Sequence, residues 1–66
     1  MKVVLNGAER EVPEGTTVRA LLEGAGVDLR RIAVEVNLEV VPRSRHGERA
    51  LAAGDRVEVV TMVGGG

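Results

Sequence analysis

The first apolar residues of the chain predict a β-hairpin. Residues 3–5 and residues 8–12 are both short runs suited to strands, and only Asn6-Gly7 separates them. Asn-Gly readily adopts the two positive φ angles that a type I′ turn requires. We therefore expect two antiparallel strands joined by a tight turn, and the break at residues 13–15 ends the second strand.

The next apolar residues predict a helix with one buried face. They recur at the i, i+3, i+4 and i+7 positions that share one side of a helix: Val18, Leu21, Leu22 and Ala25. Thr16 or Thr17 is the expected N-cap, because a hydroxyl oxygen can accept a hydrogen bond from the first turn. Gly26 is the expected left-handed residue that ends the helix.

In residues 32–36 large branched apolar residues alternate with Ala33 and Glu35, which predicts a strand with one buried face. Its inward side chains would be Ile32, Val34 and Val36. Residues 37–39 turn the chain into a short strand at 40–41. Pro42 cannot donate a backbone hydrogen bond and so places this strand at an edge of the sheet.

The remaining segment predicts a loop and a final strand. Residues 43–49 are polar and irregular, and Leu51 is expected to fill the core from a loop. After Gly54-Asp55, a last strand should run from residue 56 to about residue 62. A hairpin, a crossing helix and further strands cannot form an alternating parallel α/β unit. The expected fold is α+β: a ubiquitin-like β-grasp with a mixed sheet of four to five strands and one main helix packed on one face.

Composition restricts how this fold can be stabilised and where it acts. The 66 residues contain no cysteine and no aromatic residue, so the core must be aliphatic, built mainly from thirteen valines and six leucines. A formal net charge of −1 does not favour binding to nucleic acid or to an anionic membrane surface. The N-terminus lacks a long apolar stretch, so we expect a cytoplasmic protein with no membrane contact.

Candidate catalytic and metal-binding residues are few. His46 is the sole histidine, which cannot form a metal site alone, and we expect it to be a plain surface histidine. Ser44 lacks the strand-turn-helix glycine context of a nucleophile elbow. An anion or RNA patch is conceivable on five arginines, but without aromatic stacking residues a solvated face is favoured. These arginines are Arg30, Arg31, Arg43, Arg45 and Arg49. We expect no catalytic residues and no metal.

The three glycines at 64–66 are the strongest candidate for chemistry. They follow the last strand and form a segment without side chains, which a narrow active-site channel can enclose. A carboxylate on Gly66 is a poor electrophile and must be activated by another enzyme, for instance as an acyl adenylate. A frayed terminus or a linker would look the same. We assign residues 1–63 to the β-grasp domain and 64–66 to a flexible tail, with Gly64 and Gly65 serving to thread it.

The order of elements, the end of the chain at the glycines and two segments together resemble the ThiS family of sulfur carriers in thiamin biosynthesis. The segments are residues 32–43, with an asparagine turn followed by Val-Pro-Arg, and residues 54–60, with a Gly-Asp strand start. The resemblance covers essentially the whole chain. It is more informative about fold than about pathway.

The resemblance implies a protein co-substrate that is not itself an enzyme. An adenylyltransferase resembling ubiquitin-activating enzyme would use ATP to adenylate Gly66, and a persulfide sulfur donor would convert it to a thiocarboxylate. Thiazole synthase would accept the sulfur. The carrier itself would bind no cofactor.

Alternation in the last strand predicts a docking surface. With Val57 and Val59 inward, Val60 and Met62 point outward beside the tail, and Val4 could join them if the first and last strands pair. Exposed apolar residues at this place would form a recognition patch, or they are single surface residues without a role.

Other functions use the same features. A neighbouring carrier would supply sulfur to molybdopterin or to a thiolated tRNA base, and a ubiquitin-like modifier would conjugate to lysines. An interaction module of another class would bind a protein or RNA and leave the tail idle.

Overall fold

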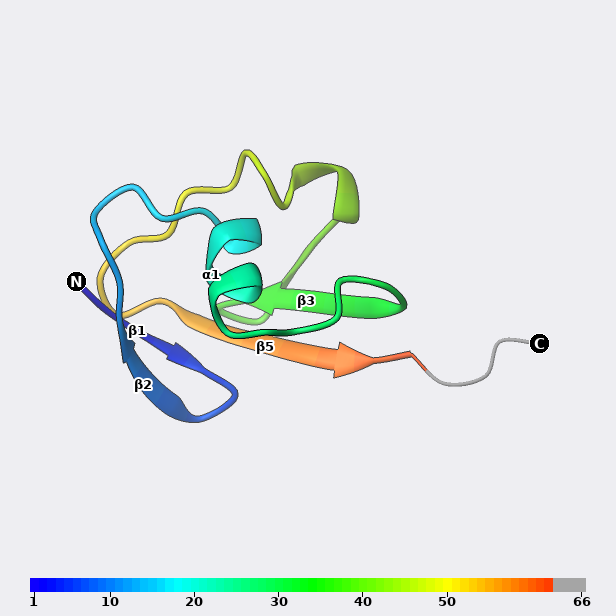
Figure 1. Cartoon of the computed structure of the whole chain (residues 1–66), viewed down its shortest axis with the longest axis horizontal. Coiled ribbons are helices and arrows are strands. Elements are labelled where there is room, and N and C mark those ends of the chain that lie inside the picture. The colour runs from blue at the N-terminus through cyan, green and yellow to red at the C-terminus, as the bar shows by residue number, and fades with distance from the viewer. Residues whose placement is uncertain (63–66) are drawn as a thin grey trace.

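The computed structural model describes residues 1–62 of the chain. Within that range one α-helix and five strands form, in the order β1 (Lys2–Leu5), β2 (Ala8–Glu11), α1 (Val18–Gly24), β3 (Ile32–Val36), β4 (Glu39–Val41) and β5 (Arg56–Thr61). The strands make one sheet in the order β2-β1-β5-β3-β4. β1 and β5 are parallel and the other neighbours are antiparallel. Figure 1 shows α1 and the connection into β5 on one side of this sheet. The predicted mixed sheet with one helix is confirmed.

The hairpin turn forms as its sequence predicts. Asn6 and Gly7 have φ angles of 48° and 83°, the two positive values of a type I′ turn. Asn6 also acts beyond the turn, because its side-chain oxygen accepts a hydrogen bond from the backbone N–H of Val59 at 2.8 Å. The first turn of the chain is thereby tied to the last strand.

Capping hydrogen bonds form at both ends of α1, at residues that the sequence pointed to. Thr17 is the N-cap, and its hydroxyl accepts from Ala20 N at 3.1 Å. At the other end Gly26 has a φ of 73° and donates to Glu23 O, while Val27 donates to Leu22 O. These two bonds form a Schellman motif, so the predicted left-handed ending at Gly26 is confirmed.

The core lies between α1 and one face of the sheet. It is aliphatic throughout and includes the predicted loop residue Leu51, which is buried. Its members are Val3, Leu5, Val18, Leu21, Leu22, Ile32, Val34, Val36, Val41, Leu51 and Val57. Branched side chains suit this face because they pack well on a pleated surface and lose little rotamer freedom there.

Two details of the second half of the chain differ from expectation. β4 begins at Glu39, because the turn uses only Asn37 and Leu38, with φ angles of 51° and 70°. A leucine at positive φ is uncommon, so the sequence did not indicate a two-residue turn here. Arg43–Arg45 forms a short 3-10 helix, η1, in place of irregular chain.

Asp55 and Asn37 hold the start of β5 in place. The buried Asp55 carboxylate accepts from Ala52 N at 2.8 Å and from the Asn37 side-chain amide at 3.0 Å. The Asn37 side-chain oxygen accepts from Arg56 N at 3.0 Å. Burial raises the pKa of Asp55, but the hydrogen bonds from Ala52 and Asn37, helped by the charge of Arg49, outweigh it and hold the pKa below its ordinary value of 3.8.

We predict that Asp55→Asn lowers the free energy of unfolding by about 1–3 kcal/mol, because one buried donor loses its acceptor. The wild-type carboxylate binds a proton more weakly in the folded than in the unfolded chain. Its stabilising contribution is therefore full above the unfolded pKa and is lost as the pH falls through the folded pKa. Urea unfolding from pH 7 down to pH 2.5 should show a smaller fall for the variant than for the wild type. An equal fall would contradict this role, and Glu14→Gln, on an exposed loop, should behave as wild type.

Candidate functional site

β5 leads the chain toward the terminal glycines from the centre of the sheet. It is hydrogen-bonded to β1 on one side and to β3 on the other. Its pairing continues to Met62, whose backbone N–H donates to Arg31 O at 2.7 Å. Arg31 adopts a positive φ of 56° at this point. Gly64, Gly65 and Gly66, the predicted tail and sulfur-carrying residues, lie outside the described residues.

The sheet face opposite α1, here called the outer face, carries the predicted docking residues. On β5, Val57 and Val59 point toward the core, as predicted, and Val60 is 57% exposed. Met62, just after the strand, is 55% exposed. Val60 lies directly opposite Ala33 of β3, and Val40 of β4, 69% exposed, lies directly opposite Glu35. Exposed Val40 and Val60 and the half-buried Ala33 thus bring apolar side chains of three strands to this face.

Val4 lies on the same face but not beside Val60. β1 and β5 pair as the prediction required, and Val4, which is half-buried, is opposite Arg56. Arg56 precedes Val60 by four positions, which corresponds to about 13 Å along the strand. The structure therefore brings Val60 together with Ala33 and leaves Val4 nearer the start of β5. Alternation could identify Ala33 and Val40 as outward residues, but only the strand register places them beside Val60.

Comparison with known proteins assigns the chain to a family. A model of the ThiS family matches residues 3–66. The chain belongs to the ThiS family. This confirms the resemblance seen in the sequence.

Individual relatives agree with the ThiS assignment. Over 64 residues the chain is 42% identical to the sulfur carrier protein ThiS of Thermus thermophilus, covering 97% of this chain and 98% of that protein. It is also 50% identical over 66 residues to a thiazole synthase of Paramagnetospirillum magneticum, but it spans only 20% of that protein's length. The crystal structure of the thiamine biosynthesis protein ThiS from Geobacter metallireducens covers the whole of both chains at 32% identity with a TM-score of 0.86. The ubiquitin-like β-grasp prediction is confirmed.

Three of the five candidate arginines of this ThiS-family chain bind groups that are near them in the sequence. Arg30 donates to the Asp28 carboxylate through Nε at 3.1 Å and Nη2 at 3.0 Å, and these bonds, together with one from its backbone N–H, lower the pKa of Asp28 to about 2. Arg45 pairs with Glu48 at 3.4 Å, and Arg49 donates to the Ala50 carbonyl. Such short-range pairing is typical of a solvated face.

His46 is not the surface residue that the sequence predicted. It is only 7% exposed, and its Nε2 lies 2.9 Å from Val41 O, so this nitrogen carries the proton and donates. Its own carbonyl accepts from Arg19 N at the start of α1. The prediction was wrong because residue type alone did not reveal that η1 folds this segment back over the helix.

Ser44 and His46 share a polar depression of about 540 Å³ with Arg19 and Arg43, but they do not form a nucleophile and base. No hydrogen bond joins the two side chains, and within residues 1–62 the His46 ring is hydrogen-bonded to the backbone carbonyl of Val41. Among residues 1–62, no group of three His, Cys, Asp or Glu side chains could hold a metal ion. No helix in this range is long and apolar enough to cross a membrane.

We predict that His46→Leu destabilises the fold by about 1–3 kcal/mol, because the Val41 carbonyl loses its donor beside the core. Denaturant unfolding monitored by far-UV circular dichroism measures the change. Ser44→Ala is the matched control, since Ser44 is exposed in the same depression, and it should leave the unfolding midpoint unchanged. A His46→Leu variant as stable as wild type would contradict the structural role.

Proposed function

We propose that this ThiS-family chain is a sulfur carrier in thiamin biosynthesis and that the carboxylate of Gly66 carries the sulfur. The observation that supports this most is the extent of the family match, which runs through residue 66 and so includes the three glycines. The ring of His46, a candidate catalytic residue in the sequence, is engaged with the Val41 carbonyl instead. The chain is then a co-substrate whose chemistry is performed by partner enzymes.

The proposed reaction begins with activation by an adenylyltransferase. The Gly66 carboxylate attacks the α-phosphorus of ATP, which releases pyrophosphate and leaves an acyl adenylate. The terminal sulfur of a persulfide donor attacks the acyl carbon and displaces AMP. This leaves an acyl disulfide between Gly66 and the donor. A second thiol of the donor loses its proton and attacks the donor's own sulfur, which forms a disulfide within the donor and releases the outer sulfur on Gly66 as a thiocarboxylate.

The glycines suit this sequence of steps for a steric reason. Gly64 and Gly65 have no β-carbon, so a partner can close around bare backbone on both sides of the tail. ATP is bound by the activating partner, and the carrier itself needs no cofactor. We place these reactions in the cytoplasm, where the absence of cysteine from the chain is compatible with a reducing environment.

Thiazole synthase is the acceptor that we propose. A thiazole synthase contains a segment 50% identical to this chain. A sulfur carrier protein ThiS is 42% identical to it over nearly the full length of both proteins. Both names favour thiazole formation over molybdopterin synthesis, tRNA thiolation or conjugation to lysines. An interaction module with an idle tail would not require the glycines that the family match includes.

We predict that incubating the 66-residue chain with ATP, its adenylyltransferase and a persulfide donor exchanges one oxygen of Gly66 for sulfur. Intact-mass spectrometry measures the exchange. Deleting Gly66 removes the activated residue and should abolish it. No exchange in the wild type with any adenylyltransferase of the source organism would contradict the carrier function, and conjugates on other proteins would indicate the modifier.

We further predict that Met62→Glu reduces adenylation by about tenfold or more without unfolding the domain. A charge introduced among exposed apolar residues beside the tail should weaken docking of the adenylyltransferase. Pyrophosphate release measures adenylation, and circular dichroism checks the fold. Leu38→Glu is the matched control: Leu38 is 85% exposed but lies in the turn beside the start of β5. Normal adenylation of Met62→Glu would contradict the docking role.

A further inference from the structure

Two glutamates lie opposite each other in the middle of the outer face. Glu35 of β3 and Glu58 of β5 are directly opposite each other in the antiparallel ladder. Both belong to the outer face, because their strand neighbours Val34, Val36 and Val57 are buried in the core. Directly opposed residues have β-carbons about 5 Å apart, and like charges in this position destabilise a sheet.

No ion pair within residues 1–62 neutralises these two glutamates. None of the ion pairs among residues 1–62 involves Glu35 or Glu58. Arg56 shares the face two positions before Glu58, about 7 Å along the strand, and forms no ion pair with it within residues 1–62. The fold therefore retains a repulsive pair at a place where a polar neutral residue would be more favourable for stability.

Apolar residues lie on two sides of the pair. Val40 lies directly across from Glu35 on β4, and the next outward positions along the two central strands are Ala33 and Val60, which oppose each other. Docking on Val40 and Val60 would remove water from the carboxylates between them. Burying two unpaired anions is costly, so a protein that covers these valines must supply a cation.

Arginine matches this arrangement better than lysine. Its planar guanidinium has five donors and can bind carboxylates through two bonds at once, whereas an ammonium group acts as a point charge. One guanidinium placed over the ladder can therefore donate to both Glu35 and Glu58. Its charge would also relieve the repulsion that the free sheet retains.

We propose that the outer face is a docking surface for thiazole synthase and that an arginine of that enzyme binds between Glu35 and Glu58. This inference rests on the proposed function and names the chemistry by which the acceptor recognises its carrier. The choice of partner follows from the thiazole synthase of Paramagnetospirillum magneticum, which contains a segment 50% identical to this chain. Since that segment is part of the same polypeptide as a thiazole synthase, we choose this enzyme as the partner.

The test measures binding of purified thiazole synthase from the source organism to wild-type carrier and to Glu35→Gln, Glu58→Gln and the double variant. Calorimetric titrations at roughly 0.05 M and 0.5 M salt separate the charge contribution, which screening reduces. The double variant should bind about tenfold more weakly at low salt and nearly as wild type at high salt. Its unfolding midpoint should not fall, because the substitutions remove a repulsion.

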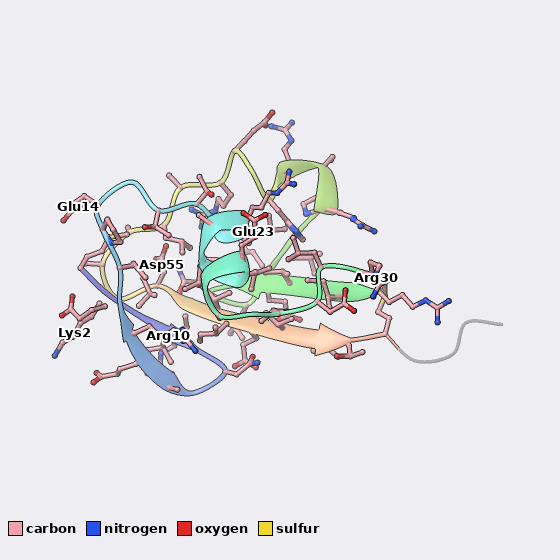
Figure 2. The ribbon with its side chains drawn as sticks, viewed as in Figure 1. Lys2, Arg10, Glu14, Glu23, Arg30 and Asp55 are labelled. Carbon is pink, nitrogen blue, oxygen red and sulfur yellow. The ribbon has the colours of Figure 1, made fainter. Side chains whose placement is uncertain are left out.

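The control is the double variant Glu14→Gln/Glu23→Gln, which removes the same charge from the loop before α1 and from α1 itself, away from the outer face. Figure 2 shows Glu14 at the end of the molecule opposite Arg30, which precedes the start of β3. This control should bind as wild type. Equal affinity of the Glu35/Glu58 variant and the wild type would overturn the proposal, and so would an equal loss in the control or the absence of any binding to thiazole synthase.

Failure of this inference is distinguishable from failure of the proposed function. A wild-type chain that acquires sulfur on Gly66 but binds independently of Glu35 and Glu58 contradicts the docking proposal alone. A chain that binds thiazole synthase through the two carboxylates but never acquires sulfur contradicts the carrier function alone.

Discussion

The structure depends on how β5 is held between β1 and β3. Backbone pairing to β3 runs from Val57 to Thr61, but pairing to β1 covers only two positions. Side chains extend it: Asn6 binds Val59 N, and Asn37 binds Arg56 N. An amide oxygen can accept where a neighbouring strand has already turned away. The last described strand is thus fixed on both sides before the chain reaches the glycines.

A small aliphatic core gives the domain only a small free energy of unfolding, so polar groups at the boundary of the core need hydrogen-bond partners. Residues 43–51 serve this purpose as much as they connect β4 to β5. Their carbonyls at His46 and Arg49 accept from the first two N–H groups of α1, which no helical carbonyl can reach. The His46 ring in turn binds Val41 O. No buried side-chain nitrogen or oxygen in the described residues is left without a partner.

Local signals predicted much of the fold. Asn6-Gly7, the apolar spacing of α1 and Gly26 each specify their structure through nearby residues, and each prediction held. The failures concern contacts between distant segments. Burial of His46 requires η1 to fold onto the helix, and the neighbours of Val60 depend on strand register, which alternation alone does not determine. The prediction for Gly64, Gly65 and Gly66 rests on residue type and lies outside the described residues, whereas the neighbours of Val60 on the outer face could be found only from the register.

Alternation along β5 gives the two faces of the sheet independent roles. Val57 and Val59 face the core, while Glu58 and Val60 face outward on the same strand that leads to the tail. A partner that binds the outer face is therefore positioned relative to the tail by the strand itself. Outward residues can change without altering the core, because successive side chains point to opposite sides. Proteins with one fold can thus differ on their outer faces, and for this chain the outward residues that we propose to distinguish its acceptor are the opposed glutamates Glu35 and Glu58.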